Sequence, residues 1–196
     1  MGKIVYIMGK SSTGKDTIFK ALLSDKDYNF NTIVSYTTRP IREGEKDGVE
    51  YHFVNEAAFE ALSEAGKVVE ARAYETCHGL WRYFTVADEA INLKESSYLT
   101  IGTLESYKKV RDYFGKDNVI PVLIELDDGV RLTRALNREK KQDVPKYDEM
   151  CRRFLADARD FDEELIKKAK IKKRFKNEDL SLCLSEIKKY LRIEMA

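Results

Sequence analysis

The chain has 196 residues, of which 43% are hydrophobic and 35% charged, and its formal net charge is +1. These values fit one soluble domain with a hydrophobic core, and the balanced charge provides no overall field that attracts nucleic acid or an anionic membrane. Cys77, Cys151 and Cys183 are scattered without any Cys-x-x-Cys spacing. They favour reduced thiols in the cytoplasm over disulfides or a zinc site, and the apolar run before Gly9 is too short for a signal peptide or a membrane span.

The first predicted elements are a strand, a glycine-rich turn and a helix. Ile4–Met8 is a β-branched run typical of a buried strand, and Thr17–Leu23 has the spacing of an amphipathic helix. Gly-x-x-x-x-Gly-Lys lies between them, from Gly9 to Lys15. Glycines let successive N–H groups turn inward, the helix N-terminus favours negative charge, and the lysine adds a mobile positive charge. The combination predicts a loop that binds the phosphates of a nucleoside triphosphate.

Within this loop the residue at position 16 departs from the usual pattern. Asp16 stands where Ser or Thr normally supplies a hydroxyl ligand for magnesium. Because a carboxylate is also a hard oxygen ligand, Asp16 is the predicted Mg²⁺ ligand. The alternative to the whole interpretation is an ordinary glycine and serine turn with a solvated lysine. The residues expected to contact ATP through the loop are Gly9, Ser11, Ser12, Thr13, Gly14, Lys15, Asp16 and Thr17.

Residues 35–85 predict a small β-rich insertion. In chain order we expect a short strand at 29–34, a half-exposed antiparallel strand at 49–54, a helix at 56–65, a strand at 68–71 and an irregular aromatic segment at 79–85. Arg39 and Arg42 lie in a turn held by Pro40 and Gly44. Two guanidiniums there can clamp a phosphate, with the Tyr51 hydroxyl as a further donor. The alternative is a surface turn with two solvated arginines.

From residue 86 onward, strands and helices alternate. We expect helices at 86–94, 104–114, 129–141, 147–169 and 179–191, and strands at 98–101, 119–124 and 171–175. Pro121 suggests an early or edge position for its strand. Arg131, Arg134 and Arg138 recur at spacings of three and four, so they share one helix face. Strands separated by such helices predict an α/β fold in which helices cover both faces of a parallel sheet.

Two neighbouring segments carry a resemblance to a known family. Ser35-x-Thr-Thr-Arg39 through Arg42-x-Gly44-Glu45, followed by Asp47-Gly48-x-x-Tyr51-His52-Phe53, resembles the GMP-binding segment of the guanylate kinase family. With the opening loop, Glu70 and Asn177-x-Asp179-Leu180, the resemblance covers nearly the whole chain in order. It implies one domain over 1–196, with a P-loop parallel sheet flanked by helices, a small β-rich nucleoside-monophosphate-binding insertion and a helical lid. The implied divisions are a core at about 1–34, 86–135 and 154–196, the insertion at about 35–85, and the lid at about 136–153.

The resemblance also implies roles for individual residues. Ser35 and Glu70 would bind the guanine edge, and Asn177 would lie near the adenine of ATP. The residues that would contact GMP are Ser35, Arg39, Arg42, Tyr51, Glu70 and Tyr83. The residues that would act on the transferring phosphoryl group are Lys15, Arg39, Arg138 and Arg153, with Arg134 and Arg152 as close competitors for the last two positions.

Physical chemistry independently favours Glu70 as a guanine contact. A carboxylate accepts from the N–H groups at N1 and N2 of guanine, whereas adenine presents an acceptor at N1. The alternative is a glutamate of an edge strand facing water. His52 lies in an alternating strand and is expected to be structural, while His78 is a candidate ligand contact in the aromatic loop.

Three positions depart from the family pattern. Asp16 is the first. The family's Tyr-Gly-Thr is here replaced by Arg82-Tyr83-Phe84-Thr85, where Tyr83, Phe84 and the nearby Trp81 can stack on a base or pack the insertion against the core. The acidic Asp-x-Asp strand end has become Thr100-Ile101-Gly102-Thr103, which removes a carboxylate expected near the base and the metal.

Together these features predict a kinase of purine nucleotide metabolism that converts ATP and GMP to ADP and GDP with Mg²⁺. Either GMP or dGMP fits as the acceptor. A related kinase of another acceptor, such as a different nucleotide or a phosphorylated ribose, is favoured by the lost strand-end carboxylates. A non-catalytic guanylate kinase-like binding module is the alternative of a different class. No nucleic-acid or membrane partner is expected, and the sequence leaves the oligomeric state open.

Overall fold

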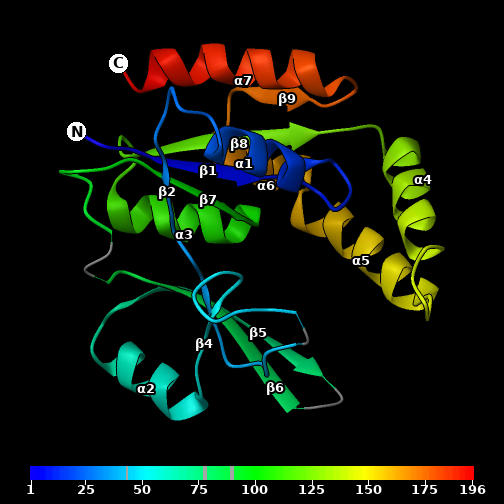
Figure 1. The fold of residues 1–196 in the computed structure, drawn as a ribbon, viewed down its shortest axis with the longest axis horizontal. Helices are drawn as coiled ribbons and strands as arrows, with labels where there is room; N and C mark the ends of the chain where they lie inside the picture. The colour runs from blue at the N-terminus through cyan, green and yellow to red at the C-terminus, as the bar shows by residue number, and fades with distance from the viewer. Residues whose placement is uncertain (43, 77–78, 89–90) are drawn as a thin grey trace.

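The computed structural model describes residues 1–42, 44–76, 79–88 and 91–196. Within these residues the strands form a five-stranded sheet and a separate four-stranded sheet, which we call the core sheet and the small sheet (Figure 1). The core sheet has the order β2-β7-β1-β8-β9, and all of its strand pairs are parallel. Its strands are β1 (Ile4–Met8), β2 (Asn31–Thr32), β7 (Tyr98–Gly102), β8 (Val119–Glu125) and β9 (Arg174–Lys176).

Alternate residues of β1 face opposite sides of the core sheet, and each side has its own hydrophobic cluster. Tyr6 packs with residues of α3 and α6 on one side, and Ile7 packs with residues of α1 and α7 on the other. All five residues of β1 are buried, which explains why the sequence there is continuously apolar. The helices other than the one that packs on the small sheet are α1 (Lys15–Leu23), α3 (Leu104–Phe114), α4 (Asp128–Glu139), α5 (Tyr147–Asp160), α6 (Glu163–Lys168) and α7 (Leu180–Glu194). The predicted α/β fold with a helix-covered parallel sheet is confirmed.

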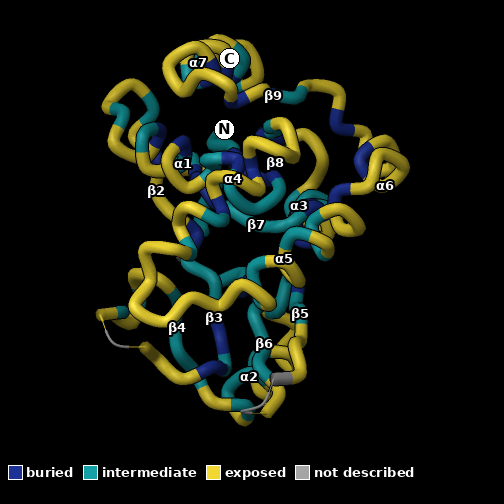
Figure 2. The backbone as a smooth tube through the Cα atoms, turned by 90° about the vertical axis from the view of Figure 1, so that its right-hand side faces the viewer, coloured by how far each residue is buried: buried dark blue, intermediate teal, exposed yellow. Residues whose placement is uncertain are grey.

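The small sheet lies below the core sheet in both ribbon and tube views (Figures 1 and 2). Its order is β4-β3-β6-β5, and α2 covers one of its faces, where Phe59 packs edge-on against Phe84 at 4.9 Å. The elements are β3 (Tyr36–Thr37), β4 (His52–Phe53), α2 (Glu56–Glu64), β5 (Val68–Thr76) and β6 (Gly79–Val86). The segment predicted to be irregular and aromatic is therefore a strand, because it pairs with β3 and β5 and its Phe84 packs on α2.

Two further predictions for the first half of the chain are wrong. The segment 49–54 contributes only His52–Phe53 as a strand, and this strand runs parallel to β3 rather than antiparallel to a neighbour. The described part of 86–94 is not helical, and residues 89 and 90 lie outside the description. There the Leu93 carbonyl accepts from the Gly2 N–H at 2.7 Å, and the neighbouring backbone forms separate short turns, with Ile91 donating to Asp88 and Ser96 to Asn92.

The second half follows the prediction more closely. The expected helix at 147–169 is divided into α5 and α6, because Phe161 enters the core and Asp162 caps the new helix by accepting from the Glu164 N–H. Pro121 lies in the first half of an interior strand, ahead of Leu123, where pairing with β9 begins. Its early position is thus confirmed and an edge position is excluded.

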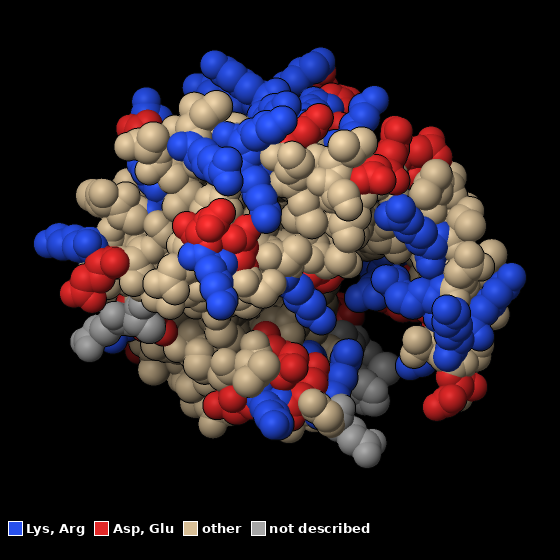
Figure 3. Space-filling view, turned by 45° about the horizontal axis from the view of Figure 1, so that its top comes forward, with Lys and Arg blue, Asp and Glu red and all other residues tan. Residues whose placement is uncertain are grey.

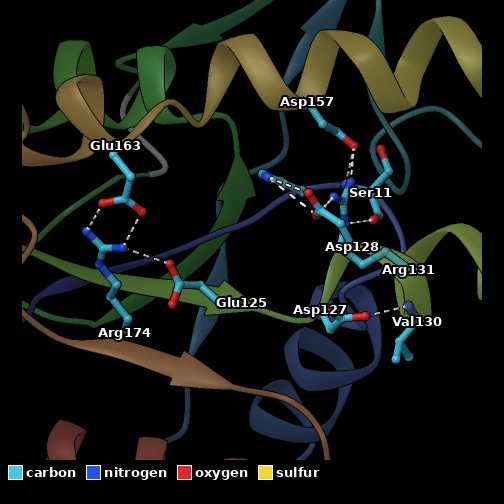
Figure 4. Close-up of polar contacts among 10 residues, drawn as sticks. Ser11, Glu125, Asp127, Asp128, Val130, Arg131, Asp157, Glu163 and Arg174 are labelled. Carbon is cyan, nitrogen blue, oxygen red and sulfur yellow. Dashed lines mark hydrogen bonds and ion pairs between the residues drawn. The ribbon is translucent and has the colours of Figure 1, made fainter.

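Arg174 joins the end of the core sheet to α6. Its guanidinium bonds Glu125 of β8 at 3.0 Å and Glu163 of α6 at 2.7 Å (Figure 4).

Cys151 and Cys183 are free, as expected, whereas Cys77 is outside the described residues. Across the described residues, we find no helix with the length and apolar character needed to cross a membrane.

Candidate nucleotide-binding site

The glycine-rich loop joins β1 to α1, and its glycines have a structural reason. Gly14 caps α1 with a φ of 87°, a left-handed conformation that favours glycine, and a Cβ there would collide with Nδ2 of Asn177. A Cβ on Gly9 would collide with the Ile124 carbonyl oxygen. The helix begins at Lys15, two residues earlier than predicted, so the N–H groups of its first turn follow the loop directly.

Asn177 braces this loop from the end of β9. The residue is 4% exposed, its Nδ2 donates to the Thr13 carbonyl at 2.7 Å, and its backbone N–H donates to the Glu125 carbonyl at 2.9 Å. The structure therefore brings Asn177 to the loop, although 164 positions separate it from Thr13 in the sequence.

Arg131 of α4 holds the same loop at Ser11 (Figure 4). Its side chain is 1% exposed, its Nε donates to the Ser11 carbonyl at 2.9 Å, and its Nη2 donates to Asp157 at 2.7 Å. The Asp157 carboxylate also accepts from the Ser11 N–H at 2.8 Å, and Arg131 forms a second ion pair with Asp128. Both backbone groups of Ser11 are thus bound by side chains from α4 and α5. Sequence reasoning placed Arg131 on the shared arginine face but missed its burial and the role of Asp157.

Lys15 and Asp16 begin α1 at the open side of the loop. Lys15 Nζ lies 3.9 Å from an Asp16 carboxylate oxygen, and the Asp16 side chain is 79% exposed. Thr17 is exposed as well. Among the residues described, no group of three or more His, Cys, Asp or Glu residues could hold a metal ion by itself.

The paired-arginine turn between β3 and β4 contains a closed ion pair. Arg39 is 4% exposed, and its Nη1 and Nη2 donate to the two Glu45 carboxylate oxygens at 2.8 and 2.6 Å. These bonds lower the pKa of Glu45 to about 2. The Arg39 guanidinium also lies over the rings of Tyr51 and Phe53, 5.2 Å from each centroid. The alternative of two solvated arginines is therefore wrong for Arg39, whereas Arg42 is exposed.

Tyr51 stands beside this pair with a half-buried ring. Burial raises the pKa of its hydroxyl, which therefore stays protonated at neutral pH and can donate to an anion. Ser35 is half-buried directly before β3, and its carbonyl accepts from the His52 N–H at 2.9 Å.

Glu70 lies in the small sheet on the face opposite α2. In the register between β5 and β6, Glu70 lies opposite Thr85 and Arg72 lies opposite Tyr83. These four side chains therefore share one face of the sheet, while Phe84 and α2 occupy the other. Glu70 is 3% exposed and accepts from the Thr85 hydroxyl at 3.0 Å and from Arg72 Nε at 3.2 Å. A glutamate facing water is excluded. Sequence reasoning missed Arg72 because the predicted strand ended at residue 71, whereas β5 continues to Thr76 and places Arg72, two residues after Glu70, on the same face.

A sequence model with the description guanylate kinase matches residues 1–114, more than half of the chain. The chain belongs to the guanylate kinase family. This is a family of ATP-dependent phosphotransferases, and the match ends before β8, so it does not include Arg138, Arg153 or Asn177.

Individual guanylate kinases match over different lengths. That of Malacoplasma penetrans is 29% identical over 184 residues, or 90% of this chain and 82% of the relative, and that of Streptococcus pyogenes serotype M3 is 27% identical over 98% and 86%. A more similar segment of 73 residues is 41% identical to the Enterococcus faecalis enzyme and spans only 36% of that relative's length. The crystal structure of guanylate kinase from Anaplasma phagocytophilum has the same fold, with a TM-score of 0.62 at 24% identity over 98% of this chain and 86% of that one.

The strand end that departs from the guanylate kinase pattern is filled from the neighbouring strand. A Cβ on Gly102 of β7 would collide with the Tyr6 hydroxyl, and Tyr6 is almost completely buried. Burial raises the pKa of Tyr6, so a neutral phenol lies against the position where the family pattern has a carboxylate. Thr103 caps α3 by accepting from the Ser106 N–H at 3.2 Å.

The aromatic residues of the small sheet separate into two groups. Tyr83 packs edge-on between Tyr51 and Tyr74, at 5.6 and 5.8 Å, on the Glu70 face. The His52 ring lies 4.5 Å from Tyr36, which stacks on Phe84 on the α2 face, so His52 is structural as expected. His78 lies outside the described residues.

The arginines expected to reach the phosphates lie on α4 and α5, where Lys and Arg side chains gather at the right of Figure 3. Arg134 adjoins the loop, since a Cβ on Gly14 would lie 3.9 Å from its Nη1. Arg138 is exposed one turn farther along α4. On α5, Glu149 accepts from Arg152 at 2.6 Å and forms a longer ion pair with Arg153 at 3.4 Å.

Proposed function

We propose that this protein phosphorylates GMP, or dGMP, with ATP and releases ADP and the nucleoside diphosphate. The observation that carries the proposal is the buried carboxylate of Glu70 on the face of the small sheet opposite α2. A buried carboxylate with remaining lone pairs is a strong acceptor for the N1 and N2 hydrogens of guanine, and it disfavours adenine. Family membership and the glycine-rich loop supply the donor nucleotide in the same proposal.

Catalysis in this proposal rests on positioning and charge. The N–H groups at the start of α1 and Lys15 hold the ATP phosphates, while Arg39, Arg42 and Tyr51 hold the phosphate of GMP. Because Glu45 occupies both Nη atoms of Arg39, the acceptor phosphate either displaces Glu45 or binds through Arg42 and Tyr51 beside it. Arginines of α4 and α5 neutralise the transferring phosphoryl group.

The same proposal assigns the parts of the chain. Residues 35–85 carry the acceptor, residues 136–153 form the lid, and the remaining residues form the core. Closure of the lid and the acceptor segment excludes water and so suppresses hydrolysis of ATP. We place the reaction in the cytoplasm.

Mg²⁺ fits this site as a partner of ATP. Asp16 offers a hard, exposed oxygen at the start of α1, and a metal bound there would take its other ligands from the phosphates and water. When bound, the ion neutralises phosphate charge. The proposed role of Asp16 predicts that Asp16→Ala weakens binding of MgATP more than binding of metal-free ATP, as measured by calorimetry. Equal losses, together with an unchanged Mg²⁺ dependence of turnover, contradict it.

Release of ADP from ATP and Mg²⁺, measured across a panel of acceptors, tests the function. Turnover restricted to GMP and dGMP supports the proposal. Turnover with another nucleotide or a phosphorylated ribose supports the second candidate, which is favoured by the Tyr6 phenol at the position of the expected carboxylate. No turnover with any acceptor, combined with retained nucleotide binding, supports a non-catalytic binding module.

A further inference from the structure

Arg72 has two neighbours that differ in chemistry. Its Nε donates to Glu70 at 3.2 Å, so the guanidinium lies beside the buried carboxylate proposed to bind guanine. It also borders a cavity of about 520 Å³ between the small sheet and the core. Cavities of roughly 300–1,000 Å³ are typical of small-molecule sites. One arginine therefore connects the buried acid to a space that can hold a ligand.

The cavity wall is polar where it meets Arg72. Tyr74 lies two residues farther along β5, and Thr103, Glu105 and Lys108 line the cavity from the start of α3. The Arg72 side chain is 20% exposed, in contrast to Glu70 at 1%. Arg72 is thus the more accessible member of the pair, and a base that reaches Glu70 from this side meets the guanidinium as well.

The guanidinium has donors left for such a base. In the part of the chain that the structure describes, Arg72 Nη1 and Nη2 make no hydrogen bond, while Nε is used by Glu70. Arginine recognises guanine by donating in bidentate fashion to O6 and N7, a pattern that adenine cannot match because its N6 amino group is itself a donor. A carboxylate accepts from N1 and N2 on the adjacent edge.

We propose that Arg72 is a specificity-determining residue of the acceptor site, donating from Nη1 and Nη2 to O6 and N7 of guanine while Glu70 accepts from N1 and N2. This inference rests on the proposed function, because it names how the GMP acceptor is recognised. The neutral Tyr6 phenol beside Gly102 agrees with it. No second carboxylate at that strand end competes with Glu70 for the arginine.

Substrate analogues separate the two contacts. 7-Deaza-GMP lacks the N7 acceptor but keeps the groups that Glu70 binds, whereas IMP lacks the N2 amino group but keeps O6 and N7. For the wild-type protein we expect 7-deaza-GMP to have a kcat/KM at least about fivefold below that of GMP, as for a bidentate base contact. Arg72→Lys keeps a positive charge beside Glu70 but cannot donate in bidentate fashion, so the kcat/KM for GMP divided by that for 7-deaza-GMP should fall toward one. The kcat/KM for GMP divided by that for IMP should stay at its wild-type value.

Arg72→Ala and Lys108→Ala complete the test. Arg72→Ala should show the same loss of discrimination against 7-deaza-GMP, and Lys108→Ala, a change of another cation on the same cavity, should retain the wild-type ratio. Dissociation constants for the three nucleotides provide a readout independent of turnover. If Arg72→Ala does not fold, Arg72→Lys decides the matter alone.

The possible failures are distinguishable. If the wild-type protein phosphorylates GMP and 7-deaza-GMP equally well, or if both Arg72 variants keep the wild-type ratio, the Arg72 contact is refuted and the proposed function stands. Uniform loss for GMP, IMP and 7-deaza-GMP in both variants indicates a merely structural arginine and also refutes the contact. If the wild-type protein does not use GMP at all, the proposed function fails together with this inference.

Discussion

The phosphate loop and the paired-arginine turn are each held by a buried arginine that is bound to carboxylates, but the contacts span different distances in the sequence. At the loop, Arg131 reaches Ser11 across 120 positions, and of its two carboxylate partners Asp157 belongs to a different helix while Asp128 belongs to its own. At the turn, Arg39 is bound by Glu45, only six positions away. The loop is therefore held by the global fold, whereas the turn is held by its own sequence.

This difference has consequences for motion and stability. Contacts that join β1, α4 and α5 break only when those elements separate, so the loop keeps its conformation as long as the core is folded. The Arg39–Glu45 pair can open by rearrangement of one short turn. We infer that the ATP end of the site is preformed and that the acceptor end is the part that adapts.

The largest predicted effect is a loss of catalytic rate at the loop without a loss of folding stability. Lys15→Ala should lower kcat roughly 10²–10³-fold, because a donor aimed at the transferring charge is lost. The free energy of unfolding should hardly change, since Lys15 forms a surface ion pair with Asp16 worth about 0–1 kcal/mol. Steady-state kinetics and urea unfolding measure the two quantities. A large loss of stability would show that the loop depends on Lys15 rather than on the core.

Arg131→Leu, in contrast to Lys15→Ala, should lower the free energy of unfolding. It leaves Asp157 and the Ser11 carbonyl without their buried partner, and we expect a loss of about 3 kcal/mol in the free energy of unfolding. Arg134→Leu is the matched control, because Arg134 is exposed on the same helix face. If both substitutions change the free energy of unfolding in urea by a similarly small amount, the inference that the global fold holds the loop through Arg131 is wrong.

At the acceptor end, Glu70→Ala should impair the use of GMP and leave the binding of ATP unchanged. We expect kcat/KM for GMP to fall roughly 10–100-fold through lost hydrogen bonds to a charged acceptor, while the dissociation constant of ATP stays close to the wild-type value. Kinetics with GMP and calorimetry with ATP provide the comparison. Equal losses for both nucleotides would contradict the assigned base contact.

The smallest effect concerns the turn itself. The pKa of Glu45 is lowered to about 2 from an ordinary value of 4.5 by Arg39, so its carboxylate stabilises the folded state fully above pH 4.5. That contribution is lost as the pH falls from 4.5 toward 2. The stability difference between the wild-type protein and Glu45→Gln should therefore be constant near neutrality and shrink below pH 4.5 in urea unfolding. A difference that does not depend on pH would refute the ion pair as its source.

Local patterns in the sequence determined the strand, loop and helix at the start of the chain, the boundaries of α3 and the alternation of β7, α3 and β8. Each depends on neighbouring residues: continuous apolar runs, a cap at Thr103, a stop at Gly115. Predictions failed where tertiary partners decided the outcome. β6 is a strand because it pairs with β3 and β5 and α2 covers Phe84, and α5 ends where Phe161 enters the core.

The same division applies to the candidate site. Sequence alone determined the glycine positions of the loop and the presence of paired arginines in one turn, because both follow from short-range spacing. Only the tertiary structure decided that Arg131 is a buried brace, that Glu70 is paired with Arg72, and that Tyr6 fills the space at Gly102. These contacts join residues that are distant in sequence or lie on a face set by strand register, and spacing carries no information about which distant side chain completes a buried charge.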